Sequence, residues 1–223
     1  MKAKNHPVGA VIDFPNRADA GPQLLRVQVY KYLRRQLMKG DLKPGAFIRL
    51  DDLTKKLGIS RTPLREALIQ LRTEGFVTFL PQRGIVINEV TLEELIKIYE
   101  ICGALESRVL VSVFDSIGPK EIEKMSRLNE EMNRHTSERE FDKYLQKNLS
   151  FHNVFLSLSR NELLLNYLNI LRLRAFDFTR RDWERLSRDL NYREHIRLLE
   201  LLRSRRKEEA AAYLRDVHWS YNW

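Results

Sequence analysis

The first turn of one amphipathic segment carries side chains that could read a nucleic acid. Arg61, Thr62 and Arg65 follow Ser60 in the run GISRTPLREALIQLRTEGFVTF, which spans residues 58–79. Ser60 can act as a helix N-cap, because its hydroxyl can accept a hydrogen bond from the first turn. Arginine makes paired hydrogen bonds to guanine, and threonine can bond to several bases. We therefore expect these three side chains to face base edges and phosphates.

A helix over the rest of this run must hold those side chains. Pro63 falls within the first turn, where a missing N–H costs little. Gly75 can end the helix in the left-handed conformation. One buried face is predicted by an apolar row at i, i+3, i+4 and i+7, formed by Leu64, Ala67, Leu68 and Leu71.

The flanking segments predict a helix-turn-helix followed by a wing. Residues 25–42 form an amphipathic pattern, a short extended run follows, and residues 51–57 predict a short helix before a tight turn at Gly58. After the second helix, residues 76–90 are β-branched and aromatic around the interruption PQRG, which predicts a two-stranded hairpin with a basic tip. A short helix, a tight turn and a second helix with cationic first-turn residues are typical of DNA-reading proteins.

The charge distribution supports a polyanionic partner for this segment. Residues 1–90 contain 16 Lys and Arg against 8 Asp and Glu, a net charge of +8. Residues 91–223 contain 23 against 22, a net charge of +1. The alternative is that the arginines are solvated surface charges. The concentration of charge argues against it, because counterion release at a polyanion favours such clustering.

Histidines in the second half of the chain form a weaker candidate site. Asn148 and His152 are four residues apart, so they share one helical face and can converge on one point. His195 and His218 lie on the last two predicted helices. Scattered histidines without a metal-binding spacing are more often core residues, so the residues alone define no site here. His135 ends a polar helix, where we expect a solvated or capping residue.

The composition indicates a core-forming protein of one or two domains, with 43% hydrophobic and 31% charged residues. Residues 1–20 are polar, lack an apolar signal region and predict a disordered tail. Residues 21–90 then form the winged helix-turn-helix domain, which mixes α and β. Residues 91–223 predict an all-α bundle of about six helices. The predicted fold is therefore mainly α.

Helix start signals mark this bundle at two places. Thr91 with Glu94, and Ser137 with Glu140, each have the spacing of a capping box. The single Cys102 excludes an intrachain disulfide and suits a reducing, cytoplasmic compartment. The sequence has no stretch of about 18 uncharged apolar residues, so no membrane span is expected.

Residues 37–90, LMKGDLKPGAFIRLDDLTKKLGISRTPLREALIQLRTEGFVTFLPQRGIVINEV, resemble the N-terminal domain of GntR-family bacterial transcription regulators. The resemblance implies that Arg61, Thr62 and Arg65 contact DNA. It also implies that Arg83 and Gly84 place the wing in the minor groove. Asp51 is a departure, because many members carry a basic residue there and an acid repels phosphate.

The remaining chain, to about Trp219, resembles the C-terminal FCD domain of the FadR branch of that family. The resemblance implies a divalent metal, zinc or nickel, that helps to bind a carboxylate effector. Its ligands would be Asn148, His152, His195 and His218. Asn148 stands where the family carries Asp. An amide oxygen can ligate a metal, but it brings no charge.

A second departure in the FCD-like part affects the effector. Cys102 occupies a position where the family run usually has Arg, a plausible partner for an acid group. Arg172 or Arg174 could substitute for it, and Arg174 is our predicted effector-binding residue. A surface charge is the alternative for either arginine.

The leading hypothesis is a homodimeric regulator of bacterial metabolism that binds a palindromic double-stranded DNA operator and responds to a small organic acid. One alternative is a regulator whose helical domain only dimerises and has lost metal and effector binding. A zinc hydrolase is a third, but no well-placed general base accompanies the histidines. We therefore expect no enzyme activity and no catalytic residues.

Overall fold

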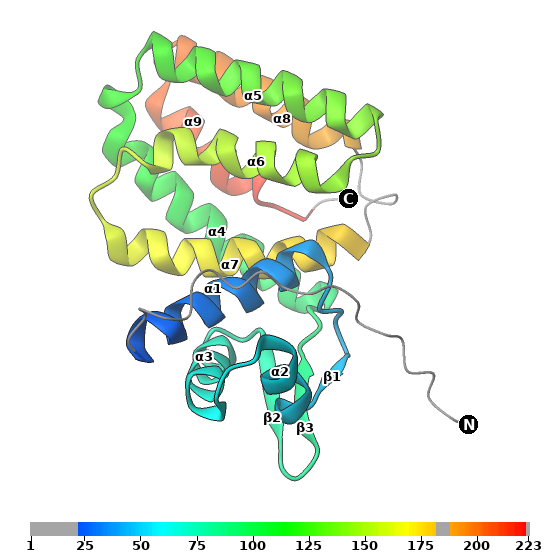
Figure 1. The fold of residues 1–223 in the computed structure, drawn as a ribbon. Helices are drawn as coiled ribbons and strands as arrows, with labels where there is room; N and C mark the ends of the chain where they lie inside the picture. The colour runs from blue at the N-terminus through cyan, green and yellow to red at the C-terminus, as the bar shows by residue number, and fades with distance from the viewer. Residues whose placement is uncertain (1–21, 182–187, 222–223) are drawn as a thin grey trace. The chain divides into compact units, whose positions relative to one another are not determined.

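The computed structural model describes residues 22–181 and 188–221, and the chain divides into two compact units, Met1–Glu89 and Val90–Trp223 (Figure 1). The tail predicted for residues 1–20 lies outside the described residues. The first unit is a winged helix-turn-helix and the second is a helical bundle. The predicted fold class is thereby confirmed.

The first unit alternates short helices and strands. In chain order its elements are α1 (Pro22–Lys39), β1 (Phe47–Ile48), α2 (Leu50–Leu57), α3 (Arg61–Thr73), β2 (Val77–Leu80) and β3 (Gly84–Ile87). The strands form an antiparallel sheet in the order β1-β3-β2. The predicted hairpin of β2 and β3 is present, and β1 joins it as a third strand because Phe47 pairs with Val86.

The core of this unit comes from the apolar row predicted for α3. Its Leu64, Ala67, Leu68 and Leu71 are all buried, and they pack with residues of α1, α2 and the sheet, including Val29, Leu33, Leu53, Leu57 and Ile85. Ser60 stands at the N-cap of α3, but its side chain makes no capping hydrogen bond. Gly75 follows the helix with a φ of 82°, the left-handed conformation that was predicted.

The wing, which is the β2–β3 hairpin, needs a glycine at its tip. Gly84 has a φ of 110°, and a Cβ atom there would lie 2.9 Å from the backbone oxygen of Ile48. Gln82 also has a positive φ, of 57°. Gly84 therefore has a local structural role, since a side chain would collide with β1.

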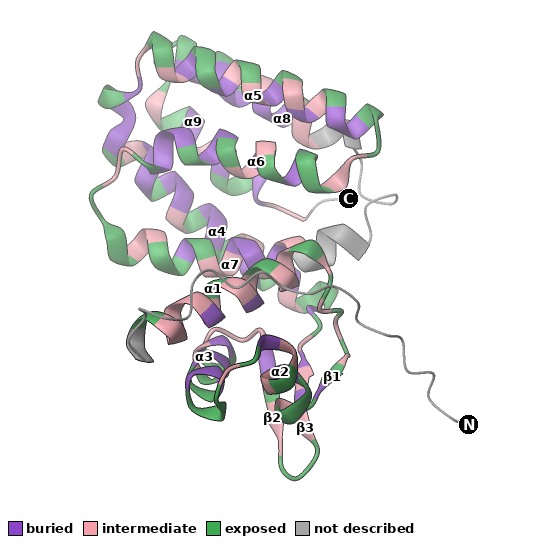
Figure 2. Ribbon diagram, viewed as in Figure 1, coloured by how far each residue is buried: buried purple, intermediate pink, exposed green. Residues whose placement is uncertain are grey.

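The second unit is built from helices. They are α4 (Leu92–Val113), the 3₁₀ turn η1 (Phe114–Ser116), α5 (Pro119–Ser137), α6 (Phe141–Leu156), α7 (Glu162–Arg181), α8 (Arg188–Arg203), α9 (Lys207–Tyr213) and the π-helical turn η2 (Leu214–His218). Helix α5 packs against α6 and α8, whereas α4 packs against α7, α9 and η2 (Figure 1). Buried residues follow the inward faces of these helices (Figure 2).

Of the two predicted capping boxes, the one at α4 forms only in part. The hydroxyl of Thr91 accepts from the N–H of Glu94 at 3.2 Å, but the carboxylate of Glu94 pairs with Arg174. The prediction for Ser137 and Glu140 is wrong. Helix α5 continues through Ser137, and the chain turns at Arg139, whose φ is 59°. Oε2 of Glu140 instead accepts a hydrogen bond from Nδ1 of the buried His135 at 2.8 Å, so His135 is not solvated.

Among the residues that the structure describes, every helix is too short or too polar to cross a bilayer.

Candidate nucleic-acid interface and metal centre

Helix α3 separates the cationic residues of its first turn from the apolar row that was predicted. Arg61, Thr62 and Arg65 are exposed, while the apolar row on the opposite face is buried. We call these three residues the DNA-reading surface, after the role that the sequence predicts for them. The wing carries a further exposed cation, Arg83. The polar side chains of the sequence motif are therefore exposed to solvent, where they could enter a groove of a nucleic acid.

Asp51 lies against this surface. Its Oδ1 atom is 2.8 Å from Nη2 of Arg61, and the two side chains are 58% and 71% exposed. Asp51 belongs to the first turn of α2 and Arg61 begins α3, so the ion pair bridges the two helices of the helix-turn-helix.

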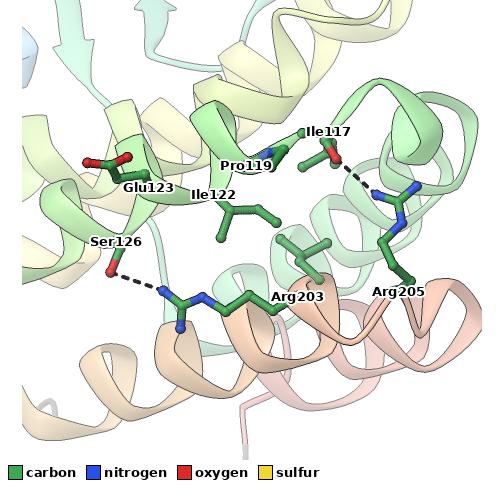
Figure 3. Close-up of a pocket in the computed structure, with 9 residues that line it drawn as sticks. Ile117, Pro119, Ile122, Glu123, Ser126, Arg203 and Arg205 are labelled. Carbon is green, nitrogen blue, oxygen red and sulfur yellow. Dashed lines mark hydrogen bonds between the residues drawn. The ribbon is translucent and has the colours of Figure 1, made fainter.

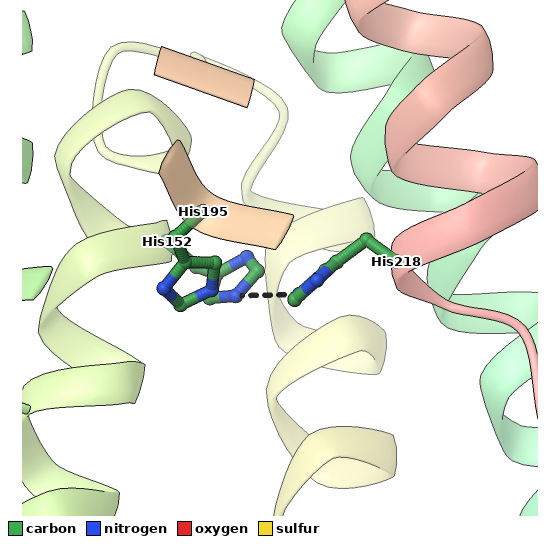
Figure 4. Close-up of side chains that lie close together, drawn as sticks. All are labelled: His152, His195 and His218. Carbon is green, nitrogen blue, oxygen red and sulfur yellow. Dashed lines mark hydrogen bonds between the residues drawn. The ribbon is translucent and has the colours of Figure 1, made fainter. Parts of the chain in front are cut away.

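The three histidines that the sequence left scattered come together inside the bundle. His152 of α6, His195 of α8 and His218 of η2 are buried, and one ring nitrogen of each lies within 4.8 Å of the others (Figure 4). We call this group the histidine centre. Its last member ends a π-helical turn, a local irregularity that often occurs at functional sites.

Each ring of the histidine centre is held through its Nδ1 atom by a different oxygen. His152 bonds to Oε2 of Glu106 at 2.7 Å and His218 bonds to Oε2 of Glu194 at 2.8 Å. His195 bonds to Oδ1 of Asn129 at 2.9 Å. The amide of Asn129 is oriented in turn, because its nitrogen donates to a backbone oxygen on α8.

These partners decide which nitrogen of each ring carries the proton. A carboxylate or an amide oxygen can only accept, so each Nδ1 must donate, and in a neutral ring Nε2 then keeps a free lone pair. The Nε2 atoms of His152 and His218 face one another at 3.2 Å (Figure 4). Nε2 of His195 is buried and has no hydrogen-bond partner among the described residues. Converging lone pairs of this kind fit a bound cation.

Burial keeps two of these rings, those of His152 and His195, neutral. It lowers the pKa of His152 to about 4, even though Glu106 opposes the shift. Burial also lowers the pKa of His195 well below its ordinary value, and the neighbouring His218 and His152 lower it further. Neutral imidazoles are the form that zinc and nickel bind.

Glu106 is a residue of the candidate site that the sequence reasoning missed. It is fully buried and also accepts from Nε1 of Trp219 at 3.0 Å, while Nε of Arg172 lies 3.4 Å from its other oxygen. Burial raises the pKa of Glu106, but His152, Arg172 and the two hydrogen bonds outweigh it and lower the pKa to about 2. A signal existed in the sequence, since Glu106 interrupts an apolar row of α4.

Two positions that depart from the family pattern lie near the centre. Asn148 is buried one turn before His152, and its amide nitrogen lies 3.7 Å from the sulfur of Met132. With His218 it lines a pocket of about 30 Å³, whose other walls include Tyr99, Tyr144, Phe176, Asn191 and Trp219. Cys102 is buried, and that burial raises the pKa of its thiol.

The two arginines considered as effector partners have different surroundings. Arg174 pairs with Glu94 on α4. Arg172 is buried beside Glu106 and donates to Oδ1 of Asn153 at 3.1 Å. Neither is among the residues that line the small pocket beside His218.

A larger cavity, of about 360 Å³, opens between the start of α5 and the end of α8 (Figure 3). Its cations are engaged with the protein. Arg205 donates to the backbone oxygen of Ile117 at 2.9 Å, and Arg203 donates to Oγ of Ser126 at 3.4 Å. The histidines are not part of its lining.

Residues 25–87 match the family described as "Bacterial regulatory proteins, gntR family", and residues 97–218 match the FCD domain. The chain belongs to the GntR family and carries a C-terminal FCD domain. The family that the sequence resembled is thereby confirmed.

Similar proteins agree with this assignment. The Nta operon transcriptional regulator of Aminobacter aminovorans is 30% identical over 172 residues, covering 77% of this chain and 80% of the relative. The uncharacterized HTH-type transcriptional regulator YdhC of Bacillus subtilis is 27% identical over 200 residues, covering 84% and 85%. The solved structure of E. coli McbR/YncC superposes with a TM-score of 0.72 at 25% identity, covering 86% of this chain and 92% of that one.

Proposed function

We propose that this GntR-family chain is a homodimeric, DNA-binding transcription regulator whose FCD domain binds a divalent metal and a small organic acid. The observation that carries the DNA-binding part is the separation of faces on α3. Arg61, Thr62 and Arg65 are exposed at its first turn while its apolar row is buried. Arg83 and Gly84 would present the wing to the minor groove.

The metal part of the proposal rests on the three converging lone pairs of the histidine centre. His152, His195 and His218 would hold zinc or nickel, with Asn148 as a neutral fourth ligand from the same face as His152. A bound divalent cation supplies positive charge on which a carboxylate can bind. The adjoining pocket of about 30 Å³ has room for about two water molecules, so an acid that binds there would have to be small and to displace part of the lining. Arg174 stays our candidate for its second contact, which would require release of Glu94.

The dimer part of the proposal rests on exposed apolar side chains of two adjacent helices. Helices α4 and α7 pack together. Their solvent-facing residues include Leu92, Ile96, Ile101, Leu163 and Tyr167, each at least 42% exposed. Large exposed apolar patches are typical of interaction surfaces. A protein of 26.5 kDa should therefore sediment at twice that mass.

The decisive experiment is a selection of duplexes from a random library with the full chain. A two-fold symmetric sequence should be enriched, because a symmetric dimer reads matching half-sites. Affinity for that sequence should then change on adding zinc or a chelator, and small organic acids can be screened for the same effect. A chain that enriches no sequence contradicts DNA reading, whereas metal-independent binding contradicts only the effector mechanism.

A further inference from the structure

The ion pair between Asp51 and Arg61 is the most informative contact on the DNA-reading surface. Both side chains are more than half exposed, and the pair joins the first turn of α2 to the first residue of α3. An exposed pair contributes little to stability. Buried leucines such as Leu57 and Leu64 already hold the two helices together. The pair therefore contributes little to folding, and we consider its effect on DNA binding instead.

The pair holds the guanidinium of Arg61 beside the carboxylate of Asp51. A free arginine on a DNA-binding surface can reach the nearest phosphate, which carries no sequence information. Asp51 occupies one terminal nitrogen of Arg61 at 2.8 Å. Since a guanidinium has five N–H donors in a planar fork, enough remain for a paired contact with O6 and N7 of a guanine.

The carboxylate also changes the balance between specific and non-specific binding. An acid beside the recognition helix repels the phosphate backbone of any duplex, so it lowers non-specific affinity. The same carboxylate orients Arg61 so that its remaining N–H donors can form hydrogen bonds with a base. Specificity depends on the difference between the two affinities.

We propose that Asp51 is a specificity-determining residue that withholds Arg61 from phosphates and presents it to a guanine edge. The inference rests on the proposed function, in which α3 reads DNA. In this proposal Arg61 makes the contact with the guanine, and Asp51 orients Arg61 for that contact.

Asp52 provides a matched control. It is exposed in the same turn of α2. Asp51→Asn and Asp52→Asn remove the same charge, but only Asp51→Asn removes the partner of Arg61. The full-length variants are titrated by fluorescence anisotropy against the selected operator and a scrambled duplex over a range of KCl concentrations. Thermal melts check the fold.

Asp51→Asn should bind the scrambled duplex more tightly. Its log–log salt slope should steepen by about 0.9 for each phosphate contact that Arg61 gains. The preference for operator over scrambled duplex should fall about fivefold or more, the lower range for one paired base contact. Asp51→Glu, which keeps the charge, should retain most of the preference. Asp52→Asn should shift both duplexes together and leave the preference unchanged.

A 7-deazaguanine scan of the operator tests the base contact directly. Removing one guanine N7 should weaken the wild type and leave Arg61→Ala unaffected at that position. Equal preferences in Asp51→Asn and Asp52→Asn would overturn the inference while the proposed function stands. A wild type without any sequence preference overturns the proposed function, and the inference with it.

Discussion

The DNA-reading surface and the histidine centre show two ways in which a chain can assemble a site. The first comes from three residues within one helical turn, all exposed. The second comes from three elements far apart in the sequence, all buried, and each ring is held by an oxygen from elsewhere in the fold. The exposed surface can change with little effect on folding, whereas changes at the centre should act on stability as well as on the proposed metal binding.

The sharpest test of that contrast is Glu106→Gln. The substitution keeps the side-chain shape but leaves the buried guanidinium of Arg172 without its counter-charge. Breaking a buried ion pair from one side should lower the free energy of unfolding by about 3–5 kcal/mol. Denaturant melts measure it. Adding Arg172→Met should restore part of the loss, and an unchanged midpoint in Glu106→Gln would break the comparison.

Acid should destabilise the metal-free protein through the histidine centre. The pKa of His152 is about 4 in the folded chain, against an ordinary value of 6.5 that applies once the chain unfolds. The unfolded chain therefore binds more protons between these values. The contribution of His152 to the free energy of unfolding is fully present above pH 6.5 and is lost as the pH falls toward 4. The loss should be about 3 kcal/mol for this ring. Melts of chelator-treated protein should show a shallower acid dependence in His152→Gln, and identical slopes would contradict the prediction.

Zinc should stabilise the protein through the same residues. At a hundredfold excess over the dissociation constant, the folded state should gain about 2.7 kcal/mol, which a rise in melting temperature reports. His152→Ala should lose the response. His135→Ala should keep it, although His135 with Glu138 and Glu140 forms a second group of possible ligands within 4.8 Å. A response that disappears only in His135→Ala would move the metal to that group.

Arg65→Ala should have the smallest effect, and one confined to binding. Loss of a paired base contact weakens operator affinity by about 1–3 kcal/mol. The melting temperature should stay close to that of the wild type, because Arg65 is exposed. Arg72→Ala, at the other end of α3, is the control. Anisotropy titrations in which Arg65→Ala binds as the wild type does would show that this turn does not read DNA.

The same contrast explains what the sequence could predict. The apolar row from Leu64 to Leu71 and the exposed residues between its members follow from helical periodicity alone, so α3 was predictable in detail. The approach of His152, His195 and His218 followed only from family resemblance, since nothing local in the sequence brings three helices together. Neither helical periodicity nor family resemblance predicted that Glu106 and Asn129 bond to Nδ1 of these rings, because they lie 46 and 66 residues from the rings they hold.

The π-helical turn η2 makes the histidine centre sensitive to the length of the chain. In an α-helix each successive side chain is rotated by about 100° around the axis. A π turn has one more residue in each hydrogen-bonded turn of the backbone, which changes the direction of the side chains that follow. His218 is the last residue of that turn. Deleting one residue from Leu214–His218 would swing the imidazole away from its two companions without altering any ligand. The spacing of the final helix is therefore as much a part of the proposed metal site as the histidines themselves.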